Sequence, residues 1–356
     1  MRFDSSFRQV ESSQGDEWAP TWGRDDILYT GNDDGASFGG MAMNAIAFGK
    51  LEGDDPLALR GSTVNPMEDF REPGGGMGPD GANWKVTNCT SVDGVLYMFV
   101  TRCLYPENSG DTRNRHVFRD SSIIKSTDGG RTWTRPAADN LRSPMFPGKR
   151  FGAPYFVWHG KDGEASVDNA AAYVYAVSNN GHFESGDNYI LGRVRKATFP
   201  ALSPADWTFF RGGDGLRDEG WTGNPDEAQP ILADENNCSM TGMTHIPALG
   251  RYVMVVWHYT TYNLRKDPTT VVEFVEAPRP WGPWTPFKKL NTGHWGWYVP
   301  VIGQRFQVPV GRTSVSCTLF VSGNYTDASL YKLNFIPITL STEPLPHGDP
   351  AYVGTP

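Results

Sequence analysis

The stretch that decides the fold is SSIIKSTDGGRTWTR, residues 121–135. The residues on either side of its centre alternate between polar and apolar, as β-strands do, and the Asp-Gly-Gly of residues 128–130 is typical of a tight hairpin turn. A hairpin explains this turn. It does not explain why Ser126, Thr132 and Trp133 are spaced around it as they are.

The pattern S-x-D-x-G-x-T-W in this stretch resembles the Asp-box of sialidase-like β-propellers. In that family the carboxylate and the hydroxyl hold the turn together while the tryptophan packs beneath it. The resemblance therefore implies a structural turn at the edge of a propeller blade. It also implies that the turn takes no part in catalysis.

A repeat along the chain extends this interpretation. The composition is 38% hydrophobic and 13% aromatic, with 40 glycines and 27 prolines, and short alternating runs dominate over helical periodicity. One unit of strands and turns recurs about every seventy residues. Its matching positions are Leu28, Leu96, Val174, Val253 and Leu319.

Five such units predict an all-β, single-domain β-propeller over residues 1–356, with five blades and with seven blades as the alternative. Seven blades would need about fifty residues each, and two further units are not found in the sequence. We also expect the N-terminal segment to complete the sheet of the last blade.

A second resemblance covers nearly the whole chain. LGRYVMVVWH (residues 249–258) and EAPRPWGPWTPF (residues 276–287) are similar to segments of sialidase-like propeller proteins. Characterised members of that group include glycoside hydrolases and polysaccharide lyases. The resemblance implies the fold and a carbohydrate-active enzyme with an oligosaccharide or polysaccharide substrate.

Charge and hydropathy exclude several classes of function. The 32 Lys and Arg against 40 Asp and Glu give a net charge of −8 without a basic run, so we expect no nucleic-acid partner. No apolar run approaches the roughly 18 residues of a membrane span. We expect a monomer. Localisation stays open between the cytoplasm and secretion with a signal peptide removed.

The four cysteines lack the CxxC spacing of a zinc site. Cys89 and Cys103 flank one predicted hairpin, where they could form a disulfide or remain free. The sequence predicts no cofactor. Histidines and carboxylates near the channel mouth could nevertheless ligate a divalent cation there.

Candidate site residues follow from propeller topology, which places the loops between second and third strands, and the entries to the first strands, on one face. Acid–base chemistry needs carboxylates or histidines, and sugar rings stack on aromatic planes. The predicted catalytic residues are Asp16, Asp34, Glu227 and His182. The predicted substrate-binding residues are Trp18, Lys85, His116, Arg150, Tyr155, Asp187, His258, His294 and Trp297.

Two structural alternatives accompany these candidates. Asp34 follows Asp33 in GNDDG, where turn chemistry alone would explain both residues. Asp16 and Glu17 precede a strand whose alternation would send one side chain inward and the other outward.

Three functions remain open from the sequence. A glycoside hydrolase would use Asp16, Asp34 and Glu227 as acid and base. A polysaccharide lyase would use His116 or His182 as base, with Tyr155 and with Arg150 as the cation that neutralises a uronate. A non-catalytic glycan-binding propeller would need only the tryptophans.

Overall fold

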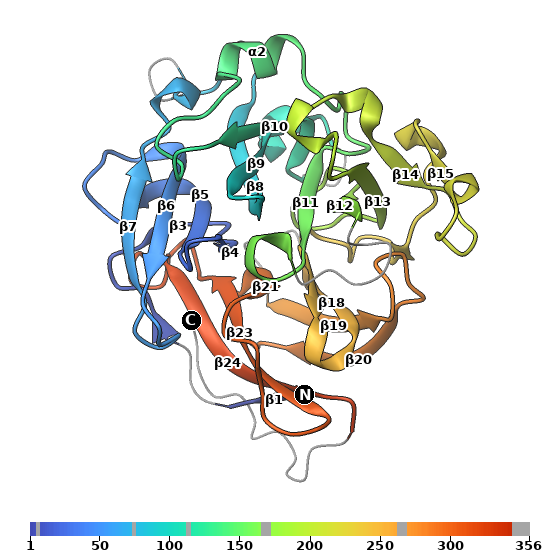
Figure 1. Ribbon diagram of the computed structural model, residues 1–356. Helices are drawn as coiled ribbons and strands as arrows, with labels where there is room; N and C mark the ends of the chain where they lie inside the picture. The colour runs from blue at the N-terminus through green and yellow to red at the C-terminus, as the bar shows by residue number, and fades with distance from the viewer. Residues whose placement is uncertain (5–7, 73–75, 112–114, 165–171, 262–268, 344–356) are drawn as a thin grey trace.

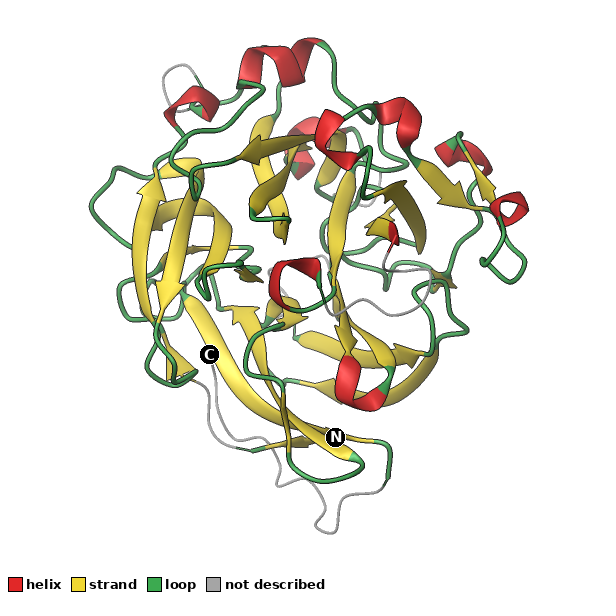
Figure 2. Ribbon diagram, in the orientation of Figure 1, coloured by secondary structure: helices red, strands yellow, loops and turns green. Residues whose placement is uncertain are grey.

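The computed structural model describes residues 1–4, 8–72, 76–111, 115–164, 172–261 and 269–343. Strands make up most of the regular structure, and the helices are short segments in the connections (Figure 2). No helix within these ranges is long and apolar enough to cross a membrane.

The described strands form four hydrogen-bonded sheets around a common centre (Figure 1). The parallel pairing of β11 with β17 divides the largest sheet into two antiparallel groups, so that five antiparallel groups follow one another along the chain. The first group contains β3 (Gln14–Asp16), β4 (Thr21–Trp22), β5 (Leu28–Ser37), β6 (Asn44–Glu52) and β7 (Arg60–Asn65). The second contains β8 (Asn83–Val92), β9 (Val95–Leu104) and β10 (Val117–Ser126). The third contains β11 (Ala153–Trp158), β12 (Tyr173–Asn179), β13 (Asn188–Arg195), β14 (Thr208–Phe210), β15 (Trp221–Thr222) and β16 (Leu232–Ala233).

The fourth group contains β17 (Met243–Ile246), β18 (Arg251–Tyr259), β19 (Thr270–Ala277) and β20 (Thr285–Asn291). The fifth contains β21 (Tyr298–Ile302), β22 (Val308–Pro309), β23 (Ser314–Ser322) and β24 (Leu333–Ser341), joined by β1 (Arg2–Phe3) and β2 (Arg8–Gln9). The N-terminal strands pair with β24, so the start of the chain completes the last group, as predicted. The all-β propeller prediction is confirmed.

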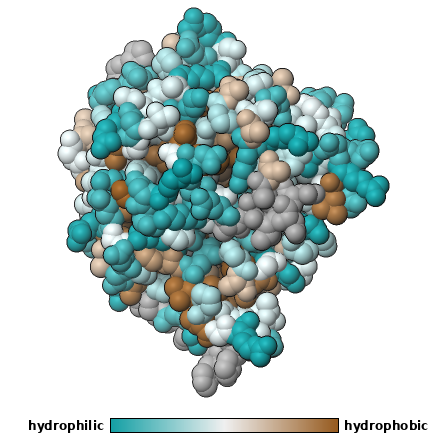
Figure 3. Space-filling model, viewed as in Figure 1, coloured by the Kyte–Doolittle hydropathy of each residue, from teal (hydrophilic) through white to brown (hydrophobic). Residues whose placement is uncertain are grey.

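Burial decreases from the centre of the molecule outward. Every residue of the inner strands β11 and β21 is buried, whereas most residues of the outer strands β7 and β20 are partly or fully exposed. The inner strands β11 and β17 even share a short parallel pairing between two groups. The face of the molecule seen in Figure 3 is mainly hydrophilic, with small apolar areas. The apolar core therefore surrounds the centre and fixes the ends of the inner strands.

The turn after β10 contains the contacts predicted for residues 126–133. The Ser126 hydroxyl donates to Asp128 Oδ1 over 2.7 Å, and the backbone N–H of Gly130 donates to Ser126 Oγ over 2.9 Å. The N–H and hydroxyl of Thr132 both donate to the Asp128 carboxylate. Trp133 packs edge-on against Phe48 with ring centroids 4.9 Å apart. These contacts make the turn a link between the second group and the first.

The disulfide alternative is not realised, because all four cysteines are free and buried. In the β8–β9 pairing Cys89 lies opposite Met98, and Cys103 lies opposite Asn83. The two cysteines are therefore not cross-strand neighbours in the hairpin.

Candidate active site

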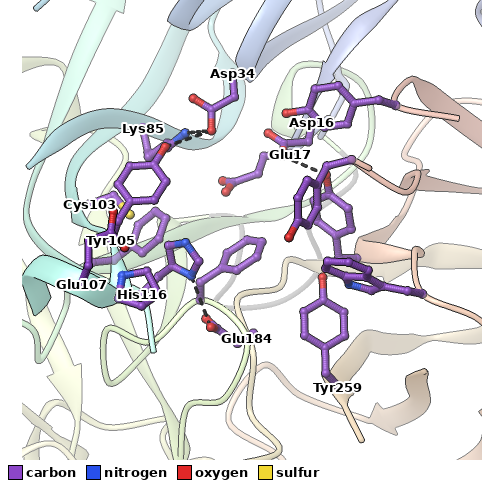
Figure 4. Close-up of a pocket in the computed structure, with 17 residues that line it drawn as sticks. Asp16, Glu17, Asp34, Lys85, Cys103, Tyr105, Glu107, His116, Glu184 and Tyr259 are labelled. Atoms are coloured by element: carbon purple, nitrogen blue, oxygen red, sulfur yellow. Dashed lines mark hydrogen bonds and ion pairs between the residues drawn. The ribbon is translucent and has the colours of Figure 1, made fainter. Parts of the chain in front are cut away.

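A cavity of about 590 Å³ opens where the ends of strands from all five groups meet. Carboxyl and aromatic side chains dominate its lining (Figure 4). The lining residues are Asp16, Glu17, Asp34, Lys85, Cys103, Tyr105, Pro106, Glu107, His116, Phe118, Phe183, Glu184, Tyr259, Trp295, Tyr298, Tyr325 and Tyr331.

Two consecutive acidic residues, Asp16 and Glu17, both line the cavity. Strict strand alternation predicts that only one of them would do so. Asp16 ends β3, and Glu17 adopts a left-handed backbone conformation with φ of 56°. This conformation interrupts the alternation, so that both carboxyl groups are directed to the same side.

The pair Asp33 and Asp34 lies on the neighbouring strand β5, and its two side chains have different surroundings. The residues continue the strand instead of forming a turn, and Asp33 lies opposite Asp16 in the pairing of β3 with β5. Asp34 has φ of 47°. Asp34 lines the cavity, while Asp33 is buried and accepts a hydrogen bond from the Val86 N–H over 3.0 Å.

Lys85, on β8, is the cation of this wall. Its ammonium forms an ion pair with Asp34 and lies 5.6 Å from the ring centre of Tyr105. The Tyr105 hydroxyl also donates to Asp34 Oδ2 over 3.2 Å. Burial alone would lower the pKa of Lys85, but the surrounding carboxylates raise it well above its usual range. Lys85 therefore stays charged, although only 4% of it is exposed.

Asp16 is a carboxyl group of the cavity whose surroundings change its pKa. Tyr298 donates its hydroxyl to Asp16 Oδ2 over 2.8 Å, and the side chains of Tyr298 and Tyr331 both act to lower the pKa of Asp16. Asp16 Oδ1 has no hydrogen-bond partner among the described residues. Burial, and then the negative charge of Asp34, raises the pKa of Asp16 to about 6. Asp16 can therefore exchange a proton near neutral pH.

Glu17 and Asp33 are the acidic neighbours of Asp16. Burial, followed by the neighbouring carboxyl charges, raises the pKa of Glu17 well above its usual range, and burial does the same for Asp33. One oxygen each of Asp16, Glu17 and Asp33 lies within 4.8 Å of the others. Carboxylate oxygens are suitable ligands for a hard divalent cation. The divalent cation considered from the sequence stays a prediction, and these three residues are where it would bind.

The side of the cavity opposite Asp16 holds a carboxyl group and an imidazole in contact with each other, those of Glu184 and His116 (Figure 4). His116 Nδ1 lies 3.2 Å from Glu184 Oε1. The imidazole packs between the rings of Tyr105 and Phe183, at 5.2 and 5.8 Å. Glu184 is 6% exposed, and its Oε2 has no hydrogen-bond partner among the described residues. Glu184 thus offers a carboxylate oxygen to a bound molecule.

Three aromatic side chains form an adjoining wall of the cavity. Trp295 contacts Tyr259 and Tyr325 with ring centroids 5.9 and 4.6 Å apart, in both cases with nearly perpendicular planes. Tyr325 is exposed at the rim. A sugar ring stacks its apolar face on such aromatic rings and donates hydrogen bonds from its hydroxyl groups to carboxylates beside them.

Four of the predicted site residues are brought together by the structure. Asp16 and Asp34 of the catalytic set line the cavity, as do Lys85 and His116 of the substrate-binding set.

Glu227 lies elsewhere. It ends the short helix η8 (Pro225–Glu227), is exposed, and accepts a hydrogen bond from the Thr222 hydroxyl over 2.7 Å. The sequence interpretation placed Glu227 on the face formed by the loops and the entries to the first strands. The inner strand β17 begins only at Met243, and residues 223–230 lie between the outer strands β15 and β16. Glu227 is therefore not a partner of Asp34 in this structure.

His182 and Asp187 belong to the loop that supplies Glu184, but neither lines the cavity. His182 is buried, and burial lowers the pKa of its imidazole. Asp187 accepts hydrogen bonds from the Asn180 side chain and from the Asn236 N–H. The sequence had indicated this loop but not the residue in it that reaches the cavity.

The remaining candidates have structural surroundings outside the cavity lining. Arg150 donates to the carbonyl oxygens of Pro225 and Ala228 and to the side chain of Asn188. Tyr155, Trp18 and Trp297 are fully buried in the core, whereas His258 and His294 are half-buried outside the lining.

Sequence reasoning left several lining residues out of the site, among them Glu184, Glu17, Glu107, Trp295 and the tyrosines of the cavity. Glu184 lies in SNNGHFESGDN (residues 178–188) and Tyr325 in SGNYTDAS (residues 322–329), both loops that the propeller topology assigns to the mouth. The loop assignment was an available signal. The direction of each side chain within a loop was not.

A family model described as "Domain of unknown function (DUF4185)" matches residues 80–321. A comparison with curated proteins finds no match.

Several solved structures are similar to the chain. Exo-β-1,3-galactanase from Phanerochaete chrysosporium, bound to β-1,3-galactotriose, is 11% identical with a TM-score of 0.47, and the match covers 96% of this chain and 64% of the galactanase. Endo-arabinase from Bacteroides thetaiotaomicron is 10% identical with a TM-score of 0.46, covering 96% of this chain and 99% of the other. A GH43_1 enzyme from Xanthomonas citri, in complex with xylose, is 10% identical with a TM-score of 0.47, covering 95% and 91%.

Proposed function

The chain belongs to the family described as Domain of unknown function (DUF4185), and this description names no reaction. From the residues of the cavity we propose that the protein is a glycoside hydrolase. Asp16 and Glu184 are its acid–base pair. The observation that carries the proposal is that two carboxyl groups in different surroundings lie on facing sides of one aromatic-lined cavity. Glycoside hydrolysis needs such a pair, one to protonate the leaving oxygen and one to act as base or nucleophile.

The surroundings of the two carboxyl groups assign their roles. Asp16, whose pKa is raised to about 6, carries a proton in weakly acidic solution and is the general acid. Glu184 accepts from His116 at one oxygen and presents the other, so it is the base or nucleophile. Tyr298 positions Asp16, and the Lys85–Asp34 ion pair adds the charges that adjust its pKa.

The aromatic wall of Tyr259, Trp295 and Tyr325 supplies the surface on which a sugar ring would stack. A pyranose or furanose has an apolar face that such rings bind and hydroxyl groups that the carboxylates orient. The wall supports a carbohydrate substrate without specifying the sugar.

β-Elimination is less well supported by the same geometry. A lyase needs a cation that is free to neutralise the uronate carboxylate. Arg150, the cation that the lyase hypothesis requires, donates to backbone carbonyls outside the cavity, and Lys85 is paired with Asp34.

The first test is digestion of a glycan panel that includes neutral hexose, neutral pentose and uronic acid polymers. New reducing ends without ultraviolet-absorbing unsaturated products are expected. Unsaturated products would indicate the lyase, and binding without cleavage would indicate a glycan-binding propeller.

The second test separates the roles of the two carboxyl groups. Asp16→Asn should retain activity on a nitrophenyl glycoside, because that leaving group needs no proton, while losing activity on the natural linkage. Glu184→Gln should lose both activities. Asp128→Asn and Glu227→Gln are the matched controls, since both residues lie outside the cavity. Retention of nitrophenyl activity by Glu184→Gln alone would reverse the assignment.

A further inference from the structure

The described lining of the cavity holds more carboxyl groups than cationic groups, although the raised pKa values of Asp16 and Glu17 reduce the negative charge that these two residues carry. It holds one lysine and no arginine, and its one histidine, His116, contacts Glu184. Against these stand five carboxyl side chains, those of Asp16, Glu17, Asp34, Glu107 and Glu184.

The lysine is not available to a bound anion. The ammonium of Lys85 is paired with Asp34, and Asp33 and Asp16 also attract it. It is buried beneath this wall and lies against the ring of Tyr105. An anionic ligand would have to displace a carboxylate of the protein to reach it.

The remaining carboxylates face the space where a ligand would sit. Glu184 offers an oxygen without a partner among the described residues, and Glu107 is exposed on the short helix α1 (Pro106–Ser109) at the rim. Like charges repel strongly in a partly desolvated cavity, because water screens them less there than at an open surface.

We propose that the cavity accepts glycan units without a negative charge and rejects units that carry a carboxylate. This inference rests on the proposed function, since it names the substrate class of the same site. Neutral sugars satisfy the carboxylates through their hydroxyl groups, whereas a uronic or sialic acid brings a further anion.

Matched pairs of glycans test the proposal. Neutral oligosaccharides from the panel would be oxidised at their primary hydroxyls to carboxylates, and acidic ones would be reduced at their carboxyl groups to primary alcohols. Equilibrium binding to the Asp16→Asn variant, which lacks the proposed general acid but keeps the carboxylates of Glu184 and Glu107, and kcat/KM of the wild type would be measured for both members of each pair. The uncharged member should bind at least about tenfold more tightly, a difference of the size expected for one unfavourable charge contact. High salt should narrow the difference, because it screens repulsion.

Glu107→Gln provides a second measurement, because Glu107 has no role in the proposed chemistry. Removing this rim charge should strengthen binding of the acidic member relative to the uncharged member, so that the difference between the two dissociation constants becomes smaller. Equal or tighter binding of the acidic member would overturn the inference while leaving hydrolysis standing. Charge-selective binding without cleavage would overturn the proposed function alone. If no member of any pair binds, both proposals fail.

Discussion

Two aspartates, Asp16 in the cavity and Asp128 in the turn after β10, show how surroundings give the same side chain opposite properties. Burial and the charge of Asp34 raise the pKa of Asp16 to about 6, and one of its oxygens lacks a partner among the described residues. Hydrogen bonds from Thr132 and Ser126 lower the pKa of Asp128 to about 2. A carboxylate whose oxygens are satisfied by local donors stabilises structure, whereas one held incompletely satisfied in a cavity is available for chemistry.

The largest effect should separate these aspartates by activity. Asp16→Asn is expected to lower kcat on a natural glycan by at least about a hundredfold, because the leaving oxygen loses its proton donor. Asp128→Asn should leave kcat unchanged. Steady-state kinetics on both purified variants, with circular dichroism to confirm folding, measures the contrast. Equal losses in the two variants would remove the distinction between a chemical and a structural carboxylate.

The pH dependence of the wild type should show an effect of about tenfold for each pH unit. As the general acid, Asp16 must be protonated, so kcat should fall as the pH rises above about 6. Lys85 lowers the pKa of Asp16, so Lys85→Met should move this fall to higher pH. The measurement is a kcat profile of both proteins. A profile that is flat through this range, or a shift to lower pH in the variant, would contradict the assignment of Asp16.

Stability should show a smaller effect, confined to the turn. Asp128→Asn is expected to lower the free energy of unfolding by about 1 kcal/mol at neutral pH, through lost charge-assisted hydrogen bonds at a largely exposed site. Because the folded pKa of Asp128 is depressed, its contribution is present above the unfolded value of 3.8 and is lost as the pH falls through about 2. Denaturant titrations of wild type and variant should therefore converge in acid.

The contribution of Asp16 to the free energy of unfolding changes with pH in the opposite direction, because its pKa is raised in the folded state. Its contribution to stability is present below its unfolded value of 3.8 and is lost as the pH rises through about 6. Asp16→Asn should thus gain stability relative to the wild type over that range. Parallel pH dependences for the two aspartate variants would show that their surroundings do not differ as described.

The smallest effect is expected for Glu227→Gln. Glu227 is exposed and bonded to Thr222 away from the cavity, so kcat/KM should stay within about twofold of the wild type. The same assay on Glu184→Gln, which makes the same chemical change inside the cavity, is the comparison. A large loss in Glu227→Gln would restore the role that the sequence interpretation assigned to it.

The sequence by itself determined the fold class and the turn of residues 126–133. Both follow from local rules: alternation predicts strands, and Ser126, Asp128 and Thr132 lie close enough in the chain to bond one another whatever surrounds them. It also indicated Asp16, Asp34, Lys85 and His116, because propeller topology assigns their segments to the mouth.

Only the tertiary structure decided which acidic residues share the cavity. The left-handed φ of Glu17 directs its side chain against the strand alternation, and no local pattern in the sequence predicts this conformation. Glu184 lines the side of the cavity opposite Asp16, whereas His182 and Glu227 do not reach the cavity. The path of the loop decides between Glu184 and His182, and the late start of β17 leaves Glu227 between outer strands. Hydrogen bonds within a turn depend on residues that are neighbours in the sequence. The facing carboxyl groups of the cavity come from segments far apart in the chain, and only packing around the centre of the molecule brings them together.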